Sequence, residues 1–525
     1  MRALPVLAVM LCACSGGGGS SSTTVPPEPA GAPIGDRAIS GTSPFAPGCG
    51  GAGGTLFVNA EVEPHLAADP RDANHLVAAW QQDRWSNGSA QALMAAASFD
   101  GGATWSARAL PFSACAGEGA GRGAEFLRVS DPWLAFGADG TVFAIGLASR
   151  GGSFAAGSSN AILVSRSADG GRTWSDPVAA MRDGAGFLDD KETITADPLD
   201  ARFAYAVWDR VDPKSQGATY FARSVDGGLT WEAARAIDDP GPGAQTIGNL
   251  VRVLPDGTLV CLLTHLVGDE DRVTSATLEV LRSGDRGLTW SAPIPVASLQ
   301  ALGARDPLTG AKIRDGSILA QMAAAPDGSL AIAWQDGRFA GTHDGIALSR
   351  SRDAGRTWSA PVRVNADVAA TAFTPQVHVR ADGTIGVGYF TLRTERPDPA
   401  RLPADYRLAQ STDGEHWSEA VVSAPFDLST APLADGEPFL GDYTGLASAG
   451  DAFLPLYART TGSTDNRTDV FFARVAPAAP KRTAVYRGEP FPERAFDAGF
   501  ARRVAANLSA ARAALRDRSK APPPR

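Results

Sequence analysis

The stretch SFDGGATW, residues 98–105, decides the fold because near-copies of it return along the chain. The copies share the pattern Ser-x-Asp-x-Gly-x-Thr-Trp, and we call them Ser-x-Asp turns. They run over Ser167 to Trp174, Ser224 to Trp231, Ser283 to Trp290, Ser351 to Trp358 and, one residue shorter, Ser411 to Trp417. Successive copies begin about 60 residues apart, and such a regular spacing indicates stacked or radially repeated units.

A second kind of turn lies before most Ser-x-Asp turns and separates two apolar runs. In one unit the runs are 133–136 and 141–147, with Asp139-Gly140 between them. The arrangement recurs around Asp256-Gly257, Asp327-Gly328 and Asp382-Gly383. Asp-Gly between apolar runs is a strong hairpin signal. Each unit is therefore predicted to hold four antiparallel strands, A to D, with the A–B and C–D turns at one end.

These units predict an all-β chain, a β-propeller of four-stranded antiparallel blades. The sequence contains seven A–B strand pairs but only six Ser-x-Asp turns. Seven blades are therefore preferred, and six are the alternative. We expect Thr55 to Glu61 to pair into the last sheet, 439–475, and close the ring. A short amphipathic helix is predicted over Phe496 to Arg518 from its helical spacing of apolar residues, and we expect it on the outside of the ring.

The N-terminal residues predict export. Residues 1–14 form a lipoprotein-type export signal with an apolar run, and Leu11 to Cys14 resembles the bacterial lipobox, which makes Cys14 the lipidation site. An ordinary secretory signal is the alternative. Residues 15–52 are predicted as a flexible Gly/Ser/Pro-rich tether, 53–478 as the propeller, and 479–525 as an extension with the helix and a disordered tail.

Charge and cysteines narrow the classes of partner. The net charge is −9, and the repeat region holds no cluster of Lys and Arg, so we expect no nucleic-acid partner. Membrane contact is expected through the lipid anchor only, at the cell envelope, unless the protein is secreted. Cys49 and Cys115 can pair in an oxidising compartment, while Cys261 is predicted as a buried thiol. We expect a monomer without cofactor or metal, because His65 and His265 lack metal-ligand spacing.

The Ser-x-Asp turns resemble the Asp-box, or bacterial neuraminidase repeat, and the span 61–475 resembles the sialidase superfamily. The resemblance implies that these turns are structural and lie at the end away from any active site. The opposite end is where the A strands begin and the B–C loops lie. Residues opening the A strands there are Glu61, Glu63, Arg128, Asp131, Asp190, Lys191, Glu192, Asn249, Arg314, Asp315, Gln376, Asp442 and Tyr443.

The resemblance assigns roles to some of these residues. Tyr443 is placed like the tyrosine nucleophile of sialidases, and Asp83 like their acid/base aspartate. Asp131, before Pro132, matches a polar position of the second blade, and Glu192 is a candidate to assist catalysis. Arg84, Arg210 and Arg338 follow three B strands that end alike, and together they are candidates to bind an anionic group such as the carboxylate of sialic acid.

Two departures keep other interpretations open. The stretch Val62 to His65 stands where the family has an Arg-Ile-Pro motif, and Asn249 and His265 stand where it has a glutamate and an arginine. The function is therefore either a retaining exo-glycosidase that removes terminal sialic acid or a related acidic sugar, or a non-catalytic propeller that binds a glycan or a protein at the cell surface. Alternatively, Arg84, Arg210 and Arg338 form simple salt bridges between neighbouring blades.

Overall fold

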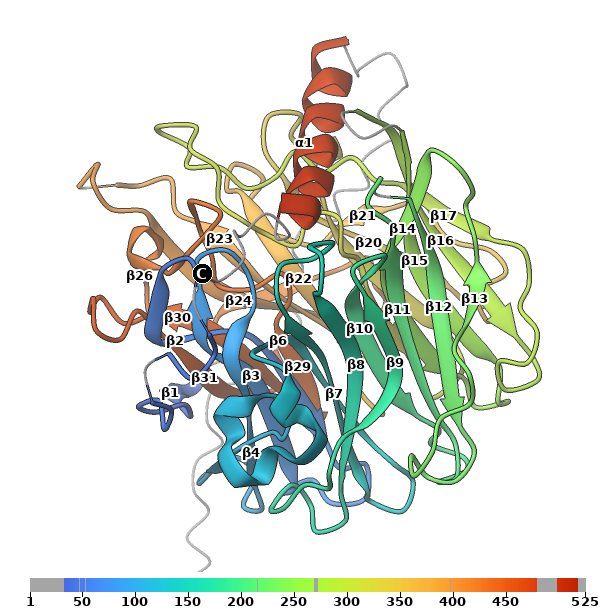
Figure 1. Ribbon diagram of the computed structural model, residues 1–525. Coiled ribbons are helices and arrows are strands. Elements are labelled where there is room, and N and C mark those ends of the chain that lie inside the picture. Colours follow the sequence, from blue (N-terminus) through green and yellow to red (C-terminus); the bar gives the residue numbers. More distant parts are fainter. Residues whose placement is uncertain are drawn as a thin grey trace, which may run out of the picture.

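A computed structural model describes residues 33–478, except 47, 52, 215, 269–271 and 397, together with 498–517. This part of the chain is all-β apart from three 3-10 segments and one C-terminal helix, α1 (Ala498–Asp517) (Figure 1). Among the described residues, no helix has the length and apolarity needed to cross a bilayer. The predicted export signal and Cys14 lie outside the described residues.

The described strands form antiparallel meanders that follow one another along the chain. The first holds β2 (Leu56–Ala68), β3 (Leu76–Trp85), β4 (Ala90–Ser98) and β5 (Ser106–Ala109). The second holds β6 (Arg128–Phe136), β7 (Val142–Arg150), β8 (Ser159–Ser167) and β9 (Val178–Gly184). The third holds β10 (Leu188–Ala196), β11 (Ala204–Val211), β12 (Gly217–Ser224) and β13 (Arg235–Asp238).

The later meanders repeat this order. The fourth holds β14 (Ala244–Val253), β15 (Leu259–Gly268), β16 (Val273–Ser283) and β17 (Ile294–Ser298). The fifth holds β18 (Gln321–Ala324), β19 (Leu330–Asp336), β20 (Gly345–Ser351) and β21 (Val362–Arg363). The sixth holds β22 (Ala372–Val379), β23 (Ile385–Leu392), β24 (Pro403–Ser411) and β25 (Ser418–Val421). The last holds β29 (Gly445–Ala449), β30 (Ala452–Thr460) and β31 (Thr468–Val475).

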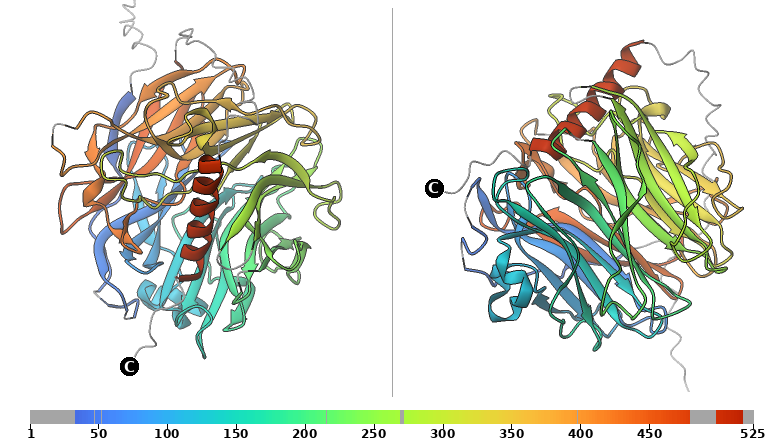
Figure 2. Two further views of the ribbon diagram at one scale, coloured as in Figure 1. Left: turned by 90° about the horizontal axis from the view of Figure 1, so that it is seen from above. Right: turned by 45° about the vertical axis from the view of Figure 1, so that its right-hand side comes forward.

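Short elements join these meanders. They are β26 (Phe426–Asp427), β27 (Leu433–Ala434), β28 (Glu437–Pro438) and the 3-10 segments Ala114–Glu125, Gly337–Phe339 and Leu428–Thr430. The first strand of each meander, which we call its inner strand, contacts the inner strands of its neighbours, and β29 contacts β2. The result is a propeller-like arrangement (Figures 1 and 2).

The N-terminal strand β1 (Pro33–Ala38) completes the last meander, because it pairs antiparallel with β31. Its Asp36 accepts hydrogen bonds from Tyr457, at 2.8 Å, and from Arg459. The segment Thr55 to Glu61, which we expected to pair into the last sheet, does so at one position only and does not supply the outer strand. Residues 56–61 belong to β2, whose main partner is β3, and β2 meets β31 only at Ala60 opposite Thr468.

The folded body therefore begins well before the boundary predicted at residue 53. From Pro33 onward, parts of the segment predicted as a tether belong to the body, since β1 lies in it. A disulfide joins Cys49 to Cys115 with an S–S distance of 2.06 Å, so it ties this segment to the loop after the first meander. Cys261 is a buried free thiol on β15.

The Ser-x-Asp turns hold their own backbone and contact the preceding meander. In the turn 283–290, Asp285 accepts hydrogen bonds from the Thr289 backbone N–H at 2.9 Å and from its hydroxyl at 2.6 Å. Trp290 packs edge-on against Phe221 of the third meander, with ring centroids 5.4 Å apart. Gly287 adopts φ +80°, and a Cβ there would lie 2.5 Å from the Phe221 ring. The turn therefore needs glycine both for its backbone and for meander packing.

The helix α1 lies across one end of the β body, not on its outside as expected (Figure 2, left). Its apolar face of Phe500, Val504 and Leu508 joins a buried cluster that includes residues of the third, fourth and fifth meanders. Asn507 donates to the carbonyl of Ala301, and the Ser509 hydroxyl accepts from the backbone of Val273. The helix covers this end because that is where its apolar face finds apolar partners.

Asp285→Ala is expected to lower the melting temperature without changing any activity, since it removes the turn's hydrogen bonds far from the other end of the sheets. A loss of about 1 kcal/mol lowers Tm by about 1 °C, because the unfolding entropy of about 2.1 cal/mol/K per residue applies to roughly 450 folded residues. The matched control is Asp465→Ala, at an exposed loop position. Thermal unfolding followed by circular dichroism compares the two, and equal Tm values would contradict a structural role for the turn.

Candidate functional site

Five inner strands carry a bulge at the same place, and this bulge positions the candidate site. The pairing register breaks at 63–64 in β2, 131–132 in β6, 191–192 in β10, 248–249 in β14 and 374–375 in β22. The first residue of each bulge has a positive φ, between 50° and 72°. For residues other than glycine this left-handed backbone costs about 1–2 kcal/mol each. Strain of this kind persists where neighbouring contacts hold it.

Ion pairs to one lysine join three of these bulges, those of β2, β6 and β10. Lys191 Nζ lies 2.7 Å from Asp131 Oδ1, 2.7 Å from Asp442 Oδ2 and 3.6 Å from Glu63 Oε1. All four side chains are at most 5% exposed. Residues from the first, second and third meanders, and from the segment before the last, thus meet where the inner strands begin.

Two arginines extend this cluster. Arg314 donates to both carboxylate oxygens of Asp442, at 3.3 and 3.1 Å, and pairs with Asp435 at 3.1 Å. Arg84 is buried and donates to Gln81 at 2.7 Å, and its guanidinium lies over the ring of Phe439 as that of Arg314 does. The cations at this end therefore have anionic or aromatic neighbours from the protein itself.

The environment moves the pKa values of these groups in opposite directions. Burial disfavours the charged form of Asp442, but Arg314 and Lys191 outweigh it and hold the pKa of that carboxyl well below its usual range. The pKa of Lys191 is held well above its usual value by Asp131, Asp442 and Glu63, against the effect of burial. Burial raises the pKa of Glu63 to about 8 and that of Asp190 to about 7, although Lys191 opposes both shifts.

Glu192 follows Lys191 in the bulge and has a different environment. Its carboxyl is buried, and neither oxygen has a hydrogen-bond partner among the described residues. Burial, and then the nearby Asp131, raises its pKa well above the ordinary glutamate value. Burial therefore favours the neutral, protonated form of Glu192. Together with Asp131, Trp133, Asn249 and Tyr443 it lines a small axial cavity of about 20 Å³, which has room for about one water.

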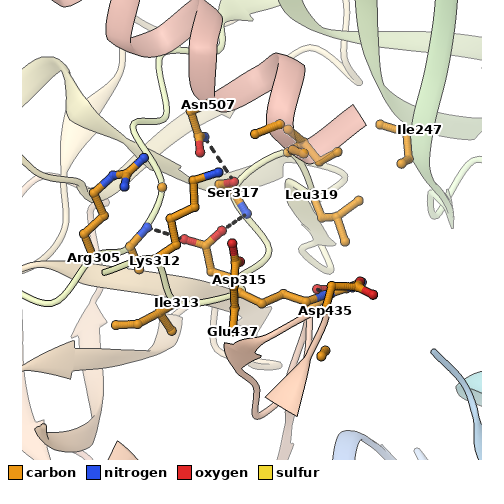
Figure 3. A pocket seen from close by; sticks show the side chains of 18 of the residues that line it. Ile247, Arg305, Lys312, Ile313, Asp315, Ser317, Leu319, Asp435, Glu437 and Asn507 are labelled. Carbon is orange, nitrogen blue, oxygen red and sulfur yellow. Dashed lines mark hydrogen bonds and ion pairs between the residues drawn. The ribbon is translucent and has the colours of Figure 1, made fainter. Parts of the chain in front are cut away.

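A mouth cavity of about 100 Å³ adjoins the axial cavity, because Lys191 and Leu319 line both. Asn507 of α1 borders the mouth cavity, and Figure 3 shows its side chain pointing toward Ser317. The side chains around the same space are the acidic Asp315 and Glu437 and the basic Arg305 and Lys312. Further lining residues are Arg314, Asp435, Asp442, Ala510 and Ala511. The helix thus forms one wall of the mouth.

Tyr443 lies in the axial cavity, but its hydroxyl donates to the Pro132 carbonyl at 3.3 Å and to no carboxylate that the described residues provide. Burial, followed by Glu63, Asp131, Glu192 and Asp442, raises its pKa well above 10. Forming the tyrosinate that a nucleophile needs is therefore disfavoured in this conformation.

The predicted acid/base aspartate and two predicted arginines do not reach this cavity. Asp83 is buried, and its carboxylate accepts from the Asn59 backbone at 2.9 Å, from Gln91 at 2.7 Å and from Ser43. These bonds join the end of β3 to β2, to β4 and to the segment before β2, since Asn59 lies in β2 and Gln91 in β4. Such contacts argue for a structural role.

Arg210 and Arg338 are already paired with aspartates, Arg210 with one on the neighbouring second meander and Arg338 with one on its own meander. Arg210 forms two hydrogen bonds to Asp183, at 2.6 and 2.8 Å, and stacks on Phe187. Arg338 forms two to Asp336, each at 2.9 Å. The three predicted arginines thus do not converge as an anion clamp, since only Arg84 lies in the axial cluster. Arg210 forms a salt bridge between meanders, as the simpler interpretation of these arginines expects, whereas Arg338 pairs within its own meander.

The structure brings together Asp131, Glu192, Tyr443 and Arg84 from the predicted set. Lys191, Glu63, Asp442 and Arg314 complete the cluster, and all four were among the residues predicted to open the A strands. Nothing in the sequence singled out Lys191. For its partners Glu63 and Asp131 one signal was available, because each stands directly before a proline, Pro64 and Pro132. No set of His, Cys, Asp and Glu side chains within the described ranges is arranged to hold a metal ion.

No protein-family model and no curated protein matches the chain. Similar solved structures include a Dyadobacter fermentans protein of unknown function, with TM-score 0.47 and 15% identity over 85% of this chain and 99% of that one. A Hadza microbial sialidase has TM-score 0.42 and 18% identity, covering 74% and 75%. A Penicillium chrysogenum alpha-L-arabinanase complexed with arabinobiose has TM-score 0.40 and 14% identity, covering 66% and 93%. The assignment of function therefore rests on the residues of the site.

The buried acids predict how stability depends on pH. Between about pH 4 and 8 the folded state keeps protons on Glu63, Asp190 and Glu192 that the unfolded chain releases, so the free energy of unfolding falls as pH rises. Glu192→Gln keeps the shape and removes one of these groups. Its stability is expected to fall less steeply, by about 1.4 kcal/mol per pH unit. Urea unfolding at several pH values measures this, and parallel curves would contradict a neutral Glu192.

Proposed function

We propose that this chain is a glycoside hydrolase of the sialidase-like propeller type, in which Glu192 donates the proton to the leaving sugar. The observation that carries the proposal is the Glu192 carboxyl, buried in the axial cavity with neither oxygen hydrogen-bonded. An acid without a protein partner keeps its proton available for a substrate. The meanders are proposed to form a closed ring of seven blades, with this cavity on its axis.

Glycoside hydrolysis needs two carboxyl groups in different protonation states. Glu192 is the neutral acid, because burial raises its pKa. Asp131 lines the same cavity and forms an ion pair with Lys191 at 2.7 Å, so it is the anionic partner. Environments that differ in this way separate the acid from the base in known enzymes. In the proposed reaction Glu192 protonates the glycosidic oxygen as its bond to the anomeric carbon breaks, and Asp131 stabilises the positive charge that develops on the sugar ring. Water then adds to the anomeric carbon and returns a proton to Glu192.

The position of the substrate follows from the size of the two cavities. The axial cavity is too small for a sugar ring, so the terminal sugar is proposed to lie in the mouth cavity, with its glycosidic bond toward Glu192. The mouth must widen for this, and α1 is the wall that moves in the proposal, since Asn507, Ala510 and Ala511 line it. The aromatic faces of Trp133 and Tyr443, 5.4 Å apart at their centroids, close the inner end.

Glu192→Gln is expected to lower kcat on natural-type glycosides by about 100- to 10,000-fold, the usual worth of a general acid. Aryl glycosides whose leaving phenol is strongly acidic need no proton, so the variant is expected to keep most of its activity on them. A panel of 4-nitrophenyl and 2,4-dinitrophenyl glycosides, assayed with both proteins, separates these outcomes. The control is Glu279→Gln on β16, whose side chain pairs with His265. Equal loss on both leaving groups would contradict the assignment.

A sialidase is the specific form of this proposal, with Tyr443 as nucleophile and release of terminal sialic acid. Its requirement is an arginine clamp for the substrate carboxylate, for which Arg84 and Arg314 are the remaining candidates at the axis. Release of sialic acid from fluorogenic sialosides by the wild type, lost in Tyr443→Phe, is the result expected for that form. No turnover by the wild type across several linkages would remove it, and unchanged activity in the variant would remove the nucleophile.

A non-catalytic propeller that binds a glycan or protein is the second candidate function. The bond from the Tyr443 hydroxyl to the Pro132 carbonyl and the position of α1 beside the mouth favour it. Binding to a glycan array without turnover of any panel substrate is the result that it predicts. In either case we propose export, with Cys14 as the lipid-anchored residue at the bacterial cell envelope. Palmitate labelling that Cys14→Ser abolishes would support this location.

A further inference from the structure

A third cavity of about 480 Å³ adjoins the mouth, because Gly303 and Arg305 line both. It lies between α1 and the loops of the fifth and sixth meanders. Its volume is within the range of ligand sites, about 300–1,000 Å³, whereas the mouth and axial cavities are smaller. The three spaces therefore adjoin in order, from Glu192 through the mouth to this third cavity.

The third cavity is lined by positive charge without a matching carboxylate. Arg305 and Arg503 line the cavity. Arg305 donates to the backbone carbonyl of Gly310 at 3.2 Å, and Arg503 donates to that of Gly341 at 2.7 Å. Neither arginine pairs with a carboxylate within the described part of the chain. The acidic group of the lining is Asp306, and its carboxylate is already paired with Arg396. Guanidinium groups left in this state offer forked donors to an anion.

The axial cluster has the opposite character. Lys191 and Arg314 are buried and already bonded to carboxylates of the protein, so a ligand anion there would have to compete with Asp131 and Asp442. Anion recognition is therefore favoured in the third cavity and not at the axis. The mouth cavity separates the two places, because it shares lining residues with each of them.

We propose that the third cavity binds a carboxylate-bearing sugar unit, so that the ligand is an acidic oligosaccharide whose terminal sugar enters the mouth. The place along the ligand rests on the proposed function, but the binding of the acidic unit does not. Arg305 and Arg503 hold the carboxylate by forked hydrogen bonds. Lys312, which lines the mouth beside Arg305, adds positive charge along the same path.

The test measures binding and needs no turnover. Tetramers of galacturonate and of glucuronate, each with its fully methyl-esterified and therefore uncharged form, are titrated calorimetrically into the full chain and into Arg305→Ala/Arg503→Ala. The control is Arg502→Ala, which changes an exposed arginine on the same helix outside the cavity lining. The expected result is that one acidic tetramer binds about ten-fold or more tightly than its ester, and that the double variant loses this preference while the control keeps it.

Three outcomes would overturn the proposal: equal affinity for the acidic and esterified forms, a preference that survives in the double variant, or no binding of either acidic tetramer at millimolar concentration. A sulfated tetramer included as a further probe shows whether the arginines require a carboxylate, and tighter binding of the sulfated form overturns the assignment to uronic acids. Failure of the proposed hydrolysis appears separately, as absent turnover with the acidic preference intact.

Discussion

The buried ammonium of Lys191 is the interaction on which the rest of the site depends. An unpaired charge in this position would cost several kcal/mol, and removing a partner from a buried pair is strongly destabilising. Asp131, Asp442 and Glu63 surround it, from different meanders. One lysine therefore links segments that are distant in sequence where the inner strands begin, and it holds bulges whose backbone is strained on its own.

The same arrangement determines what the neighbouring groups can do. Lys191 and Arg314 keep Asp442 ionised, whereas the Glu192 carboxyl has no hydrogen-bond partner among the described residues and burial raises its pKa. Adjacent residues of one bulge thus have opposite roles, because the bulge directs Lys191 to the carboxylates and Glu192 to the cavity. A sheet without the bulge would alternate these side chains regularly and lose the pairing.

Much of the fold was predictable because its signals are local. The Ser-x-Asp turns and Asp-Gly hairpins gave the strand order and the end at which the inner strands begin, and the helix 498–517 was expected over nearly the same residues. The outer strand of the last meander was not predictable, because β1 pairs with β31 across more than 400 residues and lies in a low-complexity segment. The packing position of α1 was not predictable either, because it depends on which surface of the folded sheets is apolar, and the sequence pattern does not show which surface that is.

The site was predictable as a region but not as a set of contacts. Asp131, Glu192 and Tyr443 do meet, since the first two lie at the bulges of β6 and β10 and Tyr443 lies just before β29. Arg210 bonds to Asp183 of the neighbouring second meander, and Arg338 bonds to Asp336 of its own meander. Sequence cannot tell a local ion pair from a convergent clamp, because both need an arginine at the end of a strand. It also cannot show that Lys191 is surrounded by carboxylates from other meanders.

The protonation state of Glu192 tests the central claim most directly. Protein labelled with carbon-13 at the glutamate carboxyl is titrated by NMR, and the Glu192 signal is identified by its absence in Glu192→Gln. The account predicts that this carboxyl is protonated at neutral pH and ionises only above it. A signal that ionises near the ordinary glutamate value of about 4.3 would contradict the account, because Glu192 would then have no proton to donate.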